Sequence, residues 1–97
     1  MPYIIEDQKD KLRHSIDLLV SQLETFDDEE IEGAMNYTIT TLICKRMKPP
    51  LGWKYKWINR TLGVLEAVKL EFVRRVVSNY EDGCINRNGD IDVYSDI

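Results

Sequence analysis

The sequence contains few of the residues from which metal sites, redox centres and catalytic nucleophiles are usually built. It has one histidine, His14, and two cysteines, Cys44 and Cys84, which share neither a CxxC spacing nor a histidine close by in the sequence. These residues form no recognisable zinc site or nucleophile–base pair, and we expect both thiols to be reduced and inert. A Gly-rich phosphate-binding loop is also missing. We therefore expect a protein that has no cofactor and no metal ion, and that is not an enzyme.

Long hydrophobic runs are missing as well. No apolar stretch approaches the ~20 residues that a membrane-spanning helix needs. The first residues, MPYIIEDQKDKLR, lack the basic-then-apolar order of a secretory signal. We expect a cytoplasmic protein that does not enter a membrane.

Residues that break helices are few, with five glycines and three prolines in 97 residues. Apolar residues recur at spacings of three and four, the period of an amphipathic α-helix, and Pro49 and Pro50 interrupt this pattern. We predict an all-α fold in a single domain over residues 1–97. It would be a three-helix bundle with a long third helix and a short C-terminal turn, with helices at about 6–24, 28–47 and 54–81.

The first two predicted helices each have an N-terminal signal and an apolar stripe. Glu6 and Asp7 lie in the first turn of helix 6–24, where the helix dipole favours negative charge. Asp27 is followed three residues later by Glu30, which is the spacing of a capping box. The predicted core stripes consist of Leu12, Ile16, Leu19, Val20 and Leu23 in the first helix, and of Ile31, Met35, Ile39, Leu42, Ile43 and Met47 in the second.

The third helix is expected to organise the fold. At 1.5 Å per residue, the stretch 57–80 would be about 36 Å long, whereas a compact chain of this size has a radius of gyration of about 12–13 Å. Either the helix bends near Gly63 or another chain covers part of its apolar surface. We expect a homo-oligomer, most simply a two-fold dimer built on this helix. Its apolar stripe consists of Trp57, Ile58, Leu62, Leu65, Val68, Phe72 and Val76.

Charge is segregated along the chain. Residues 1–33 hold three basic and ten acidic residues (−7), residues 34–75 hold nine basic and two acidic (+7), and residues 76–97 hold one basic and five acidic (−4), which gives the net charge of −4. The acidic ends can neutralise the basic middle, or the middle can bind an anion. The acidic ends make general nucleic-acid binding an unfavoured interpretation.

The segment WKYKWINR, residues 53–60, alternates aromatic and basic residues. Aromatic rings offer stacking surfaces and cations offer phosphate contacts, so this segment is the best candidate for a ligand site. The alternative is that the aromatic rings close the base of the bundle while the lysines point to water. The candidate ligand-binding residues are Lys54, Tyr55, Trp57, Arg60, Lys69, Arg74 and Arg75.

Paired carboxylates raise a further hypothesis. Glu29 and Glu32 are three residues apart, as in the helical nucleotide pyrophosphohydrolases, which hold magnesium between two such pairs. The third helix offers Glu66 and Glu71, which are five residues apart and so do not share a face. A metal-dependent nucleotide hydrolase is therefore the least favoured of our hypotheses.

Three stretches resemble a family of small helical proteins that is common in tailed-phage genomes: NYTITTLI (36–43), INRTLGVLEAVKLEFVRR (58–75) and YEDGCINRNGDI (80–91). The most specific pieces are GVLEAVKLEFVRR and YED…NGD. Thr41 and Arg60 depart from the family pattern, in which a basic and an acidic residue are expected. The resemblance implies a helical fold and a phage setting, and it implies no activity or catalytic residue.

These observations lead to two main functional hypotheses, both non-enzymatic. In the first, which is the preferred one, a small phage protein sequesters an anionic signalling nucleotide and so counters host defence. In the second, it is a protein–protein adaptor or inhibitor that acts on a host protein through an exposed helix face. An enclosed pocket lined by cations would favour the first, and a large uncovered apolar surface would favour the second.

Overall fold

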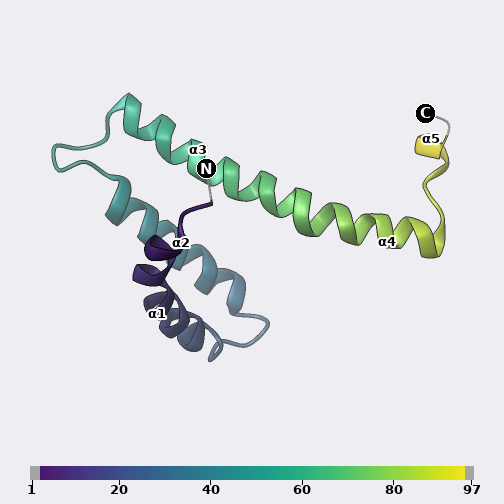
Figure 1. The fold of residues 1–97 in the computed structure, drawn as a ribbon, viewed down its shortest axis with the longest axis horizontal. Helices are drawn as coiled ribbons and strands as arrows, with labels where there is room; N and C mark the ends of the chain where they lie inside the picture. Colours follow the sequence, from purple (N-terminus) through teal and green to yellow (C-terminus); the bar gives the residue numbers. More distant parts are fainter. Residues whose placement is uncertain (1–2, 96–97) are drawn as a thin grey trace. The chain divides into compact units, whose positions relative to one another are not determined.

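The computed structural model describes residues 3–95, and within that range the regular elements are all helical, as the sequence predicts. They are α1 (Glu6–Leu23), α2 (Ile31–Met47), α3 (Tyr55–Phe72), a π-helical turn (Val73–Val77), α4 (Ser78–Asn88) and the short α5 (Asp92–Ser95) (Figure 1). No helix within residues 3–95 is both long enough and apolar enough to cross a membrane.

The chain divides into two compact units, which we describe separately. The N-terminal unit ends at Leu62 and contains α1, α2 and the first two turns of α3. The C-terminal unit begins at Gly63 and contains the rest of α3, the π turn, α4 and α5. Helix assignment continues through Gly63 without interruption. The expectation of a single domain stays a prediction.

Local polar contacts define the start of α1. The backbone N–H of Ile5 donates to Gln8 Oε1 at 3.2 Å, which satisfies a group that would otherwise lack a partner. Glu6 lies in the first turn, and its carboxylate pairs with Lys9 at 3.2 Å and with Arg13 at 3.3 Å. Arg13 also pairs with Asp10 at 2.5 Å. Exposed pairs of this kind contribute a few tenths of a kcal/mol each.

The turn before α2 contains the predicted capping box. Asp27 Oδ1 accepts hydrogen bonds from the backbone N–H groups of Glu29 (3.1 Å) and Glu30 (3.0 Å). Glu30 Oε1 in return accepts one from the N–H of Asp27, at 3.4 Å. The reciprocal pair is confirmed, although α2 itself begins at Ile31 rather than at residue 28, because residues 28–30 form a turn.

Helices α1 and α2 pack against each other in the N-terminal unit, and Figure 1 shows them side by side. On α1, Leu19 and Leu23 of the predicted stripe are half-buried, whereas its other members, Leu12, Ile16 and Val20, are 51%, 54% and 44% exposed. On α2 the stripe was partly wrong, because Met35, Ile39 and Leu42 are 40%, 44% and 57% exposed. The other three members of the predicted stripe, Ile31, Ile43 and Met47, are half-buried. Ala34, Thr38 and Thr41, which the stripe did not include, are half-buried as well.

Small and hydroxyl-bearing side chains explain that difference. The Thr38 hydroxyl donates to the Ala34 carbonyl at 2.8 Å, so its polar group is satisfied within its own helix. The methyl groups of Thr38 and Ala34 then form part of the α2 surface that lines the groove between α1 and α2. Hydrophobic periodicity marks the large side chains, and it does not detect a contact face built from alanine and threonine.

The C-terminal helices differ from the prediction of one helix ending near residue 81. Helical residues continue to Asn88, and Gly83 lies within α4. The chain leaves the helix at Gly89, whose φ of 83° is a conformation that glycine adopts without strain. The stretch Glu81–Gly83 resembles a helix end in the sequence. No proline follows it, however, so every following residue has an N–H group and the helical hydrogen bonds continue.

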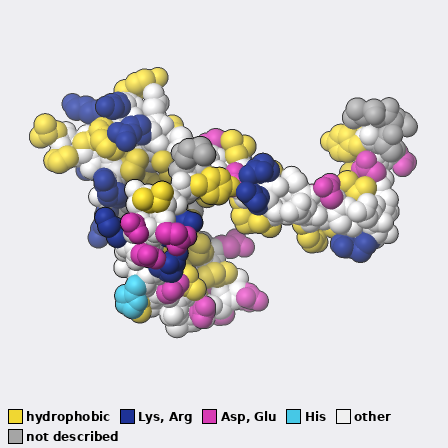
Figure 2. Space-filling model, viewed as in Figure 1, with side chains coloured by type: hydrophobic (Ala, Val, Ile, Leu, Met, Phe, Trp, Pro, Cys, Tyr) yellow, Lys and Arg dark blue, Asp and Glu magenta, His cyan; other side chains and the backbone are white. Residues whose placement is uncertain are grey.

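Burial is low throughout the described residues. Thr61 is the only one of them that is buried, and its hydroxyl donates to the Trp57 carbonyl at 2.8 Å. Within the predicted stripe of the third helix, Leu62, Val68 and Phe72 are 59%, 60% and 57% exposed. Figure 2 accordingly shows hydrophobic side chains on the surface, interspersed with charged ones. Within each unit, the helices leave these apolar stripes largely exposed.

We expect that Asp27→Ala will lower the free energy of unfolding by about 1 kcal/mol, because Asp27 Oδ1 accepts two N–H groups at the start of α2. Urea unfolding followed by circular dichroism measures this loss. Asp28→Ala is the matched control, since the N–H groups of Glu29 and Glu30 donate to Asp27 and not to the neighbouring Asp28 side chain. An equal loss in both variants would contradict the capping role.

Candidate functional site

Four of the predicted ligand-binding residues lie at the N-terminal end of α3. Lys54 immediately precedes the helix, and its carbonyl accepts hydrogen bonds from the N–H groups of Trp57 (3.0 Å) and Ile58 (2.9 Å). Tyr55 is the first helical residue and is 80% exposed. This local geometry places a cation and an accessible aromatic ring at one helix end.

Arg60 and Trp57 are in direct contact on this end of α3. The Arg60 guanidinium carbon lies 4.4 Å from the centroid of the Trp57 ring, which is a cation–π contact. Residues three apart on a helix are neighbours, so the sequence spacing fixes this pair. Trp57 is half-buried, which agrees in part with the interpretation that the aromatic rings close the base of the fold.

The N-terminal end of α3 also differs electrostatically from the other helix starts. α1, α2 and α5 each have an acidic residue in the first turn, where the helix dipole is positive. α3 has none, and it has Lys56 there with Lys54 just before it. Positive charge beside the positive end of the dipole is unfavourable, and an anion would relieve it.

The other three predicted residues, Lys69, Arg74 and Arg75, belong to the C-terminal unit. Arg74 pairs with Glu71 at 2.6 Å and Arg75 pairs with the same carboxylate at 3.0 Å, as their spacing predicts. Lys69 lies in the last turn of α3, which continues into the π turn without a break. The seven candidates therefore form two groups, and each group is described within its own unit.

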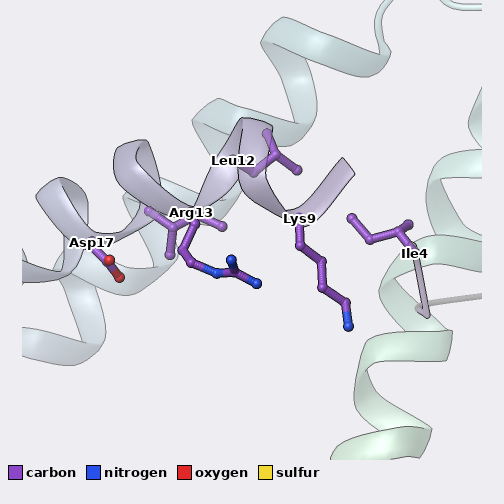
Figure 3. Close-up of a pocket in the computed structure, with 6 residues that line it drawn as sticks. Ile4, Lys9, Leu12, Arg13 and Asp17 are labelled. Carbon is purple, nitrogen blue, oxygen red and sulfur yellow. The ribbon is translucent and has the colours of Figure 1, made fainter. Parts of the chain in front are cut away.

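A hollow on α1 involves residues that the sequence did not single out as a site. It is lined by Ile4, Lys9, Leu12, Arg13, Ile16 and Asp17. Figure 3 shows Lys9 and Arg13 extending in parallel from the helix, with Ile4 of the preceding segment beside Lys9. Leu12 and Ile16 are 51% and 54% exposed, so this hollow is the uncovered N-terminal half of the α1 stripe.

Two further hollows in the N-terminal unit are mainly apolar. One lies between α1 and α2 and includes Leu23, Phe26 and Tyr37. The other is lined by Ile43 of α2, by Trp53, and by residues of α3 that include Leu62. Both are open grooves bordered by exposed apolar side chains, and the described lining of the second contains no charged residue.

In the C-terminal unit, two adjacent rows of side chains run lengthwise along α3, the π turn and α4. We call these the apolar rows. Successive members are four residues apart, and the second row begins one residue after the first. The first row is Val64, Val68, Phe72, Val76, Tyr80 and Cys84, and the second is Leu65, Lys69, Val73, Val77, Glu81 and Ile85.

The apolar rows are largely uncovered. Phe72, Val76 and Tyr80 are 57%, 50% and 66% exposed. The side-chain hydrogen bond with Cys84 raises the pKa of the Tyr80 hydroxyl above its usual 10.0, with further contributions from the charges of Cys84 and Glu81. This interaction shows that Tyr80 and Cys84 project from the same side of α4.

The carboxylates named for a hydrolase are not clustered in the part of the chain that the structure describes. Glu29 lies in the turn before α2, whereas Glu32 lies in its first turn. Among residues 3–95, no group of three or more His, Cys, Asp or Glu side chains is placed to hold a metal ion. The hydrolase hypothesis stays a prediction.

The family comparison matches residues 1–91 to the family described as Domain of unknown function (DUF6899), and the chain belongs to this family. Neither the curated proteins nor the solved structures yield a match to the chain. The family description carries no activity, so function has to be argued from the residues and surfaces described above.

We expect that Arg60→Met will lower the free energy of unfolding by about 0.5–1 kcal/mol, because it removes the cation from the Trp57 ring and keeps an apolar side chain of similar length. Lys56→Met is the matched control. It removes a cation from the first turn of α3, where the dipole disfavours it, and is expected to be neutral or slightly stabilising. Urea unfolding compares the two variants, and equal losses would argue against a specific Arg60–Trp57 contact.

Proposed function

We propose that this protein is a non-enzymatic interaction module, which self-associates through its apolar helix faces and acts on a protein partner as an adaptor or inhibitor. One observation carries the proposal. Large apolar side chains are exposed along α1, α2, α3 and α4, while Thr61 is the only buried residue in the range 3–95. Of the hypotheses drawn from the sequence, the exposed helix face therefore takes precedence over nucleotide sequestration.

The physical basis is the large gain that covering such surface provides. Removing apolar surface from water is worth about 25 cal/mol per Å². A helix whose apolar face has no partner is only marginally stable in water, because most helical stability in proteins comes from tertiary packing. In this proposal the helical bundle predicted from the sequence is completed between chains, as a homo-oligomer that is most simply a two-fold dimer.

The setting of the proposal follows from the resemblance of residues 36–91 to small phage proteins. A phage protein of this size that binds a host protein in the bacterial cytoplasm would act by occupying a surface of its target. Amphipathic helices are well suited to that task, because their apolar faces fit grooves on other proteins. This inhibitor or adaptor role requires no cofactor.

A second candidate is the binding of a small anion, such as a signalling nucleotide, at the N-terminal end of α3. The observation that favours it is the helix start itself, which lacks an acidic residue and carries Lys54 and Lys56. The exposed Tyr55 ring offers a stacking surface for a base. In this version Lys54 and Arg60 contact phosphate, while Tyr55 and Trp57 contact the base.

For the first candidate, we expect the full chain to sediment as a dimer or larger oligomer at micromolar concentration. Its melting temperature should rise with protein concentration, because association stabilises only the folded chain. Sedimentation equilibrium and thermal unfolding, each at several concentrations, measure these effects. A monomer at all concentrations, with a constant melting temperature, would contradict self-association.

For the second candidate, calorimetry with inorganic phosphate and a panel of linear and cyclic nucleotides tests binding directly. We expect Lys54→Gln and Arg60→Gln each to weaken binding about tenfold, as the loss of a charge-assisted hydrogen bond predicts. Lys11→Gln, which removes a cation of α1 that is not among the candidate ligand-binding residues, should leave the affinity unchanged. No heat from any nucleotide at high protein concentration would exclude this candidate.

A further inference from the structure

The π turn keeps the apolar rows on one side of the C-terminal helices. In a regular α-helix each four-residue step rotates a side chain by about 40°, so the five steps from Val64 to Cys84 would rotate it by about 200°. The row would then end on the opposite side. A π turn adds about one residue, which turns the following helix back by about 100°. Because the π turn lies at Val73–Val77, midway along the rows, it reduces the rotation between the first and last side chains of the row from about 200° to about 100°.

π turns are rare and often mark functional sites, which suggests that this alignment serves a contact. The rows also have the right size for one. Eight of their apolar side chains, which are 38% to 66% exposed, together present roughly 800 Å², about what one partner contributes to a stable protein interface. The eight are Val64, Leu65, Val68, Phe72, Val73, Val76, Tyr80 and Ile85.

The charges within the rows indicate what covers them. Lys69 and Glu81 are opposite in sign and belong to the same row. They are 12 residues apart, about 18 Å along a helix, so they cannot pair within one chain. Their midpoint is position 75. The rows run from 64 to 85, so their midpoint lies between 74 and 75. The charges are therefore symmetric about the centre of the apolar surface, which is the π turn.

We infer that a second copy of this chain covers the apolar rows, antiparallel to the first, with a two-fold axis at the π turn. In this arrangement, a residue of one copy faces a residue of the other copy, and their two residue numbers add up to about 150. Lys69 of each copy then lies beside Glu81 of the other, and Phe72 packs near Val77 of the other. The inference rests on the self-association proposed above, and it adds the surface, the direction and the register.

Charge reversal tests this arrangement in the full chain. We expect Lys69→Glu alone and Glu81→Lys alone each to raise the dimer Kd about 3- to 30-fold, because each change turns two attractive pairs into repulsive ones. The double variant should recover most of the wild-type Kd, measured by sedimentation equilibrium. Asp82→Lys, next to Glu81 in the sequence but outside the rows, is the control and should leave the Kd unchanged. Circular dichroism of each variant verifies that helix content is retained.

Directed disulfide formation provides a second measurement. With Cys44→Ser as background, Leu65→Cys should form a disulfide with Cys84 of the second copy under mild oxidation by diamide, because 65 and 84 sum to 149. Peptide mass spectrometry identifies the pair. Parallel copies would join Cys84 to Cys84 instead, and that product would overturn the inference.

The outcomes separate this inference from the broader proposal. An oligomer whose Kd does not respond to the charge reversals, or that the double variant fails to restore, would overturn the antiparallel register and leave self-association standing. A chain that is monomeric at every concentration would overturn both. Restoration by the double variant together with the 65–84 disulfide would support the antiparallel dimer.

Discussion

Hydrophobic burial is the constraint on which the rest of this structure depends. The chain has enough apolar residues for a core, and they fall at helical spacing, but its helices leave most of them accessible. Leu62, Val68 and Phe72 show this most clearly, because each belongs to the stripe that should organise the fold and each is more than half exposed. Surface of this kind has a strong tendency to associate, since covering it is favourable and leaving it in water is not.

Local interactions define the helices even where packing does not cover them. The Asp27–Glu30 capping box, the Glu6 ion pairs and the shared Glu71 carboxylate all act within one or two turns. Each contributes at most about 1 kcal/mol. Such contributions fix where a helix begins and ends, but they do not pack one helix against another. The α1–α2 contact is the tertiary packing that adds to them in the N-terminal unit. The proposed interaction function is consistent with this balance, because a partner would supply the missing burial.

The two candidate functions use different physical features of the same helices. Anion binding would use the start of α3, where lysines replace the acidic residues found at other helix starts. Protein binding would use the apolar rows and the open faces of α1 and α2. Lys69 is a candidate ligand-binding residue on the sequence alone, and it also lies in a row with Val73 and Val77, where the proposed antiparallel dimer pairs it with Glu81 of the second copy. The two functions use separate surfaces, so they do not exclude each other.

The sequence by itself determined the all-α class, the approximate helix positions and the capping box. All of these depend on residues within four positions of one another, which is the range over which periodicity and capping act. It did not reveal the Ala34–Thr38 contact face, because hydrophobic pattern detects large side chains and not close approach. It also missed the π turn, since an extra residue in a helix leaves the local composition unchanged. Those two features, and the exposure of the apolar rows within the C-terminal unit, were decided only by the three-dimensional structure.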